Sequence, residues 1–174
     1  HMLNVKKRPG NFAPTSLRFS TVYGLSPRMR FDLTVNEFTK ELAKGRELMV
    51  FGEQFWRPYC HVEDFSNAFL TLLTSPVDKV AFNVFNVGDT SENYTKKMIV
   101  DEIIKLIPDA RINYVKKDED PRNYRVNFDK IKHELGFQTT KRVPDGISEI
   151  ITSIRQGTFE DTEDQQYYNI PHDN

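Results

Sequence analysis

Arginines next to aromatic residues are the side chains of this sequence best suited to chemistry. Arg57 stands in FWRPYCHVED, between a glycine turn and a predicted helix, and Arg122 and Arg125 stand in the polar loop DPRNYRVNF. A planar guanidinium can hold a phosphate group through two parallel hydrogen bonds. A purely structural interpretation is also open: Arg57 covering Trp56 with its stem, and the loop arginines forming salt bridges with the acidic residues 118–120. The spacing is therefore compatible with an anion clamp but does not establish one.

The common catalytic and metal-binding motifs are missing. There is no glycine-rich GxxGxxG turn to cradle a pyrophosphate, and none of the seven tyrosines is followed by a lysine four residues later. HExxH, CxxC and GxSxG are also absent, and the four histidines are dispersed along the chain. We therefore assign no catalytic residue and no metal ligand within this sequence.

Cys60 and His61 are neighbours, a pair that invites comparison with a nucleophile and its base. Adjacent side chains of an extended segment point to opposite faces, so these two are unsuited to act on one substrate atom. We expect Cys60 to be buried and His61 to be hydrogen-bonded at the start of the following helix.

Bulk charge gives no indication of a polyanionic partner. The chain has 24 Lys and Arg against 25 Asp and Glu, which argues against nucleic acid and against an anionic membrane surface. A single cysteine excludes an internal disulfide framework, and no apolar run approaches the roughly 18 residues of a membrane span. We expect a cytoplasmic protein, and we interpret His1 and Met2 as the remnant of a cleaved tag.

Short β-rich runs alternate with helical periodicity, which predicts an α/β fold. Strands are expected at 17–23, 48–51, 81–87 and 111–115. Helices are expected at about 33–42, 62–73, 98–107, 128–135 and 144–154, the third of them capped by Thr90 or Ser91. Beyond Gly157 come five acidic residues and no Lys or Arg, so segment 157–174 is expected to be a solvated, partly disordered tail. Only Tyr167 and Tyr168 favour its docking.

Taken in order, the motifs resemble a known family. LRFSTVYG, RMRFDLTVNEF, GRELMVFGE, WRPYCHVEDFSNAF, FNVG and DPRNYRVNFDKIKHELGF are similar to the second half of the NAD-dependent epimerase/dehydratase family, extended short-chain dehydrogenases/reductases that act on nucleotide sugars. The resemblance covers about residues 12–154. It implies the last strands of a Rossmann-type parallel sheet together with the C-terminal substrate-binding portion of such an enzyme, here residues 3–156.

The resemblance also implies site residues. Ser20, Thr21 and Val22 would lie beside the nicotinamide end of bound NAD and the sugar, although many members have Asn where this chain has Thr21. The substrate would be a nucleotide-diphosphate sugar, and the residues implied to contact it are Asn36 at the diphosphate, Val50 and Phe51 at the base, and Arg57 and Arg122 at the phosphates.

Since the family's cofactor turn and catalytic Tyr/Lys pair precede these motifs, the resemblance implies a substrate-binding half that is inactive alone. Its partner would be the missing N-terminal Rossmann portion. Sheet strands left without neighbours expose hydrophobic edges, so we also expect self-association. The alternative is a non-catalytic interaction module derived from the same fold, which would not need Arg57 or Arg122.

Overall fold

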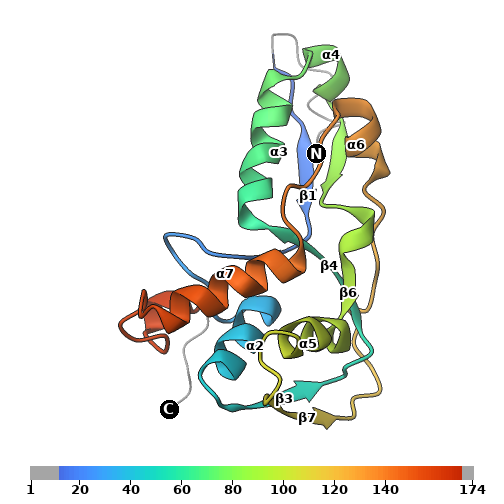
Figure 1. Ribbon diagram of the computed structural model, residues 1–174. Coiled ribbons are helices and arrows are strands. Elements are labelled where there is room, and N and C mark those ends of the chain that lie inside the picture. Colours follow the sequence, from blue (N-terminus) through green and yellow to red (C-terminus); the bar gives the residue numbers. More distant parts are fainter. Residues whose placement is uncertain (1–11, 170–174) are drawn as a thin grey trace.

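The computed structural model describes residues 12–169, and its strands and helices form two groups joined by one long strand (Figure 1). The joining strand is β4 (Trp56–His61). The first group surrounds a parallel strand pair and comprises β1 (Ser16–Phe19), β5 (Val84–Val87), α3 (Val62–Thr74), α4 (Val77–Val80) and α6 (Asp129–Leu135). The second comprises α2 (Thr34–Ala43), α5 (Lys96–Ile104), α7 (Val143–Arg155), β3 (Glu47–Phe51) and β7 (Arg111–Val115). The predicted α/β class is confirmed.

The strand predicted at 17–23 is two strands. β1 pairs in parallel with β5, and β2 (Thr21–Tyr23) pairs in parallel with β4. Ser20 lies between them, and its Oγ donates a hydrogen bond to the carbonyl of Val87 at 2.8 Å. The chain thus changes neighbour at Ser20, which brings this residue to the carboxyl ends of both β1 and β5.

Strand β4 was not predicted, and neither was the short β6 (Asn93–Thr95) that pairs with it in antiparallel fashion. Pro58 in the middle of β4 has no N–H to donate to a ladder, which makes the segment look unlike a central strand. β6 also corrects the expected helix cap. Thr95, rather than Thr90 or Ser91, caps α5, because its Oγ1 accepts the N–H of Met98 at 3.1 Å.

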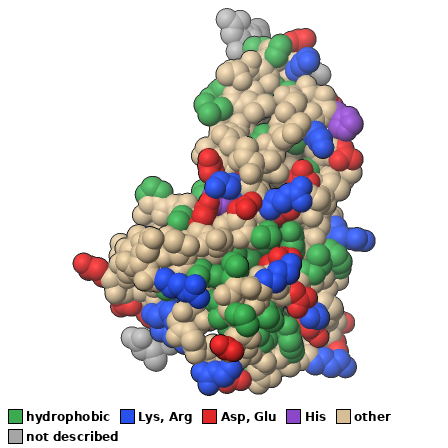
Figure 2. All heavy atoms as spheres, in the orientation of Figure 1, with side chains coloured by type: hydrophobic (Ala, Val, Ile, Leu, Met, Phe, Trp, Pro, Cys, Tyr) green, Lys and Arg blue, Asp and Glu red, His purple; other side chains and the backbone are tan. Residues whose placement is uncertain are grey.

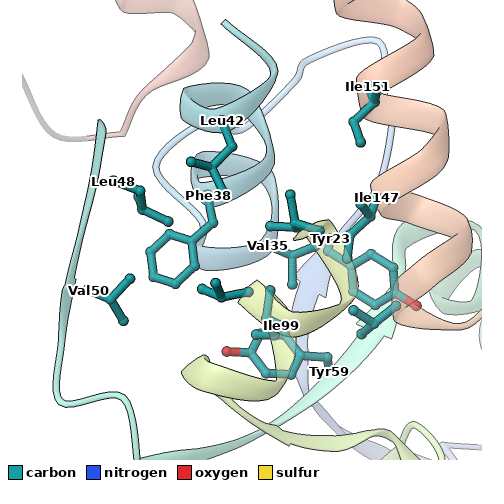
Figure 3. Packing of buried hydrophobic residues seen from close by; sticks show 13 residues of the cluster. Tyr23, Val35, Phe38, Leu42, Leu48, Val50, Tyr59, Ile99, Ile147 and Ile151 are labelled. Carbon is teal, nitrogen blue, oxygen red and sulfur yellow. The ribbon is translucent and has the colours of Figure 1, made fainter. Parts of the chain in front are cut away.

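The second group encloses the largest hydrophobic cluster of the chain (Figure 3). Helix α7 contributes the buried Ile147 and Ile151 to this cluster, whereas Ile150 of the same helix packs in a separate cluster with Phe31 and Tyr168. Full burial of such a side chain stabilises the fold by about 1.5–3 kcal/mol. On β3 the side chains alternate, so that Leu48 and Val50 face this cluster while Met49 points outward.

The end of the chain is packed where a solvated tail was expected. Tyr168 is 6% exposed, and the carbonyl of Tyr167 accepts a hydrogen bond from the N–H of Phe31 at 3.0 Å. Phe159 and Tyr167 contact the ring of Phe31 edge to face. For residues 158–169 the prediction was therefore wrong, because long-range aromatic contacts outweigh the acidic composition of the segment. His1 and Met2 lie outside the described residues.

Acidic and basic side chains are interspersed over the face shown in Figure 2. Hydrophobic side chains also reach the surface, and on α3 Phe69, Leu70 and Leu73 are 49%, 62% and 78% exposed. None of the helices within residues 12–169 combines the length and the apolar character needed to cross a bilayer.

Candidate functional site

Strand β4 places Arg57 against the polar loop that follows β7. The guanidinium donates through Nη2 to Oδ2 of Asp120 at 2.7 Å and through Nη1 to the carbonyl of Trp56 at 2.7 Å. The two charged side chains are largely shielded, with 13% of Arg57 and 7% of Asp120 exposed. The guanidinium of Arg57 is therefore held in one orientation, and the carboxylate of Asp120 already accepts one of its hydrogen bonds.

Asp120 connects the two arginines expected to form the clamp. Its Oδ1 accepts the backbone N–H of Arg122 at 2.8 Å, and the Arg122 side chain approaches the same oxygen at 3.8 Å. The N–H of Arg122 and the charge of Arg57 hold the pKa of Asp120 below its usual value. The Arg122 side chain is itself 78% exposed. Arg57 and Arg122 therefore lie around one carboxylate, and of the salt bridges expected under the structural alternative, the one between Arg122 and Asp120 is present at 3.8 Å.

Aromatic side chains frame this pair. The guanidinium of Arg57 lies 5.7 Å from the ring centre of Tyr124, and that of Arg125 lies 4.9 Å from the ring of Trp56. The backbone N–H of Trp56 donates to Oδ1 of Asn123 at 2.9 Å, which fastens the loop to β4. Arg125, the other candidate for the second arginine of the clamp, is thus engaged with Trp56.

Two cavities lie near the arginine cluster, the first through Tyr124, which Arg57 contacts, and the second through Lys96. One, of about 290 Å³, is lined by Ser20, Pro58 and Tyr124 together with Arg18, Phe19, Asn86, Val126 and Phe128. The other, of about 380 Å³, lies beside β3 and α2, and Phe51, Met49, Glu37 and Lys96 are among its lining residues. The first contains Ser20 at the carboxyl ends of parallel strands, the edge at which open α/β sheets bind ligands.

Lys96 links the second cavity to the arginine cluster. Its Nζ donates to the carbonyl of Phe51 at 2.8 Å. Burial lowers the pKa of Lys96, and Asp120 and Arg57 are the charges that influence it most. Lys96 is therefore hydrogen-bonded to Phe51 of the second cavity and lies within electrostatic reach of Asp120 and Arg57.

The remaining predicted residues are placed as follows. Thr21 and Val22 are half-buried in β2. Asn36 is 2% exposed, and its carboxamide accepts the N–H of Gly24 at 3.0 Å and donates to the carbonyl of Arg30 at 2.9 Å. In this structure Asn36 therefore holds the loop between residues 24 and 36.

Val50, predicted to line the wall against the base, does not present its side chain at the surface. Its side chain is fully buried and points from β3 into the hydrophobic cluster (Figure 3). Side chains of a strand alternate between faces, so the outward neighbours are Met49, 44% exposed, and Phe51, 50% exposed. Phe51, which was predicted at the base, lies at the surface, and Met49 beside it was not among the predicted residues.

The bond of Asp120 to Arg57 and the place of Lys96 beside this pair were not predicted. The sequence signal for Asp120 was its place in an acidic run beside Arg122, a pattern that usually means solvated charge. Cys60 is buried, and His61 accepts the N–H of Glu63 through Nδ1 at 3.3 Å at the start of α3, both as predicted. Within residues 12–169, His, Cys, Asp and Glu side chains form no group of three or more arranged to hold a metal ion.

Residues 2–88, half of the chain, match the model of the NAD dependent epimerase/dehydratase family. The chain belongs to this family, whose cofactor is NAD.

Solved structures of extended short-chain dehydrogenases/reductases share the fold. UDP-glucuronic acid 4-epimerase from Bacillus cereus, in complex with UDP-glucuronic acid and NAD, is 24% identical, with a TM-score of 0.68 over 80% of this chain and 44% of that one. dTDP-glucose 4,6-dehydratase from Bacillus anthracis, in complex with NAD, is 22% identical, with a TM-score of 0.67 over 87% and 45%. UDP-glucose 4-epimerase from Thermotoga maritima, with UDP-glucose, is 22% identical, with a TM-score of 0.68 over 82% and 46%. The chain spans less than half the length of each.

Proposed function

We propose that the chain is the nucleotide-diphosphate-sugar-binding half of an NAD-dependent epimerase or dehydratase. The observation that carries this proposal is Arg57, a shielded and oriented guanidinium that contacts Tyr124 at the wall of the 290 Å³ cavity. A diphosphate is the part of a nucleotide sugar that joins its two ends, so a cation of fixed orientation close to a cavity suits such a ligand. Structures similar to this chain hold UDP-glucuronic acid and UDP-glucose.

Each end of the ligand then has a distinct environment. The base would enter the cavity of about 380 Å³ and stack on Phe51, with Met49 beside it. Arg57 and Arg122 would bind the two phosphates. The sugar would extend into the cavity of about 290 Å³ next to Ser20.

NAD, when bound, supplies a hydride acceptor and donor. The part of it that this chain would contact is the nicotinamide end, at Ser20, Thr21 and Val22. The fit rests on the backbone: the chain switches neighbours at Ser20, and the 290 Å³ cavity opens at the same point. The chain's own contribution would be to hold the diphosphate so that the sugar is correctly oriented, which lowers the entropic part of the barrier.

The surface for the missing N-terminal half would be the free edge of β1 and the apolar side of α3. Within the described residues β1 pairs only with β5, and Phe19 lies beside Phe65 and Phe69 with ring centres 4.4 and 5.4 Å away. A strand edge without a partner next to exposed apolar side chains favours association with another strand-bearing domain.

Isothermal titration calorimetry of the chain with UDP, GDP, CDP and dTDP tests the binding function, with Arg57→Ala as the variant and Arg155→Ala, on the exposed end of α7, as control. We expect one nucleotide to bind and its affinity to fall in Arg57→Ala by about 1.5–3 kcal/mol, the value of a charged hydrogen bond. Equal affinities in both variants would contradict the assigned role of Arg57. Failure of all four nucleotides to bind would overturn the proposal and favour the interaction module.

A further inference from the structure

The anion-binding side of Arg57 is occupied by the chain's own carboxylate. Oδ2 of Asp120 lies 2.7 Å from Nη2, and both side chains are shielded, with 13% of Arg57 and 7% of Asp120 exposed. A ligand phosphate that uses this nitrogen must replace Asp120. Binding is then an exchange of one anion for another.

We propose that Asp120 is an internal counter-ion that competes with the ligand for Arg57 and so sets the affinity threshold of the site. The inference rests on the proposed function, since it concerns the same arginine. A protein whose binding-competent state is only partly populated binds every ligand more weakly by the same factor. Asp120 therefore weakens all anions alike and keeps weakly bound ones, such as inorganic phosphate, from occupying the site.

The local geometry allows Asp120 to leave Arg57 without unfolding the strand. Residues 121–125 are exposed, while Asn123 and Tyr124 remain fastened to Trp56 by hydrogen bonds of 2.9 and 3.3 Å. The exchange thus needs only the turn at Asp120 to move. Arg122, with its exposed side chain, is placed to follow the incoming phosphate.

Asp120→Asn separates the charge of this residue from its structural role. The amide oxygen of Asn can still accept the N–H of Arg122, which now bonds to Oδ1 at 2.8 Å. Its NH₂ group cannot accept a hydrogen bond from Arg57. Asp118→Asn is the matched control, because Asp118 is in the same loop, is 79% exposed and pairs with Lys116 at 3.2 Å.

Pyrophosphate and inorganic phosphate are titrated into the wild-type chain, both single variants and the double variant Arg57→Ala/Asp120→Asn. We expect Asp120→Asn to bind both anions about tenfold more tightly than wild type, by nearly the same factor. Asp118→Asn should change either affinity less than about twofold, because surface charges act weakly at a distance. The double variant should lose the gain.

Three results would overturn the proposal. Unchanged affinity in Asp120→Asn would show that no exchange occurs, and weaker affinity would show that Asp120 positions Arg57 for the ligand. If Asp120→Asn bound neither anion, Arg57 would not form an anion-binding site at all. The nucleotide titration judges the proposed function separately, since a nucleotide that binds in an Arg57-dependent way supports that function even when Asp120→Asn has no effect.

Discussion

Removal of one carboxylate from the docked end of the chain should destabilise the fold in a pH-dependent way. Lys40 of α2 is 3% exposed, and its ammonium donates to Glu163 at 3.1 Å and to the hydroxyl of Tyr168 at 2.8 Å. Arg46 also bonds to Glu163, at 2.8 Å. Glu163→Gln keeps the shape of the side chain but leaves the buried ammonium with Glu41 as its remaining anionic partner.

The size of the effect follows from the pKa of Glu163. Burial alone raises this pKa, but the hydrogen bonds from Lys40 and Arg46 outweigh it and lower the pKa from 4.5 to about 2. Such a depression corresponds to at most about 3 kcal/mol. Because the side chain is 37% exposed, solvent screening reduces the contribution to about 1–2 kcal/mol. The midpoint of thermal unfolding of a chain this long should fall by about 3–6 °C.

The sign of the pH dependence is fixed by the depressed pKa. The stabilisation is present above the unfolded value of 4.5 and is lost as the pH falls toward about 2. Urea denaturation at pH 7 and at pH 3 should therefore show a difference between wild type and Glu163→Gln that shrinks in acid. Glu160→Gln, in the same segment and without an ion pair among the described residues, is the control. Equal stability of the two variants at pH 7, or a difference unchanged at pH 3, would refute the reasoning.

Two further outcomes are expected. The Cys60 thiol is buried, and burial raises its pKa. A thiol reagent should therefore label the native chain at least tenfold more slowly than the urea-unfolded chain. Equal labelling rates would place Cys60 at the surface. The edge of β1 that has no partner strand within residues 12–169 and the exposed Leu73 should cause self-association. Light scattering after size exclusion should therefore give a mass that rises with concentration and falls in Leu73→Asp, and a concentration-independent monomer would contradict this.

Periodic apolar residues made most helices and the parallel strands predictable. α3 and α7 follow their apolar stripes, and α6 ends at Gly136, which adopts the left-handed conformation with φ of 71°. Strand β4 was not predictable in the same way, because Pro58 has no N–H to donate and so argues against a central strand. Only the neighbouring strands show how β4 is paired around this residue. Here β2 pairs at Tyr59 and β6 reaches Pro58 from the other side.

The docking of the tail depends on a partner that lies far away in the sequence. Lys40 and Glu163 are separated by 123 residues, and neither has a local signal for the pair. An acidic segment without Lys or Arg is ordinarily solvated, because its charges repel and it offers little apolar surface. Three aromatic residues and a buried ammonium reverse that expectation.

The candidate site was predictable in residue type more than in orientation. Arg57 and Arg122 do come together, but through Asp120, which sequence alone could not separate from its acidic neighbours. Val50 and Met49 show why orientation in a strand is hard to predict from sequence: a difference of one residue moves a side chain from the core to the surface. Only the packing of β3 against α2 decides which of them faces a ligand.

The polar residues of the segment WRPYCHVED have two roles: Arg57 is the candidate ligand-binding residue, and His61 and Asp64 hold the strand and helix in place. His61 bonds to Glu149 of α7 at 3.0 Å, and the buried Asp64 accepts the backbone N–H groups of Thr140 and Lys141 at 2.9 and 3.1 Å. These contacts tie the junction of β4 and α3 to the start of α7. Arg57 leaves the same strand four residues earlier and is the one charged residue of β4 that faces the loop. The fixed direction of Arg57 therefore depends on residues that never approach a ligand, because they hold the strand from which it extends.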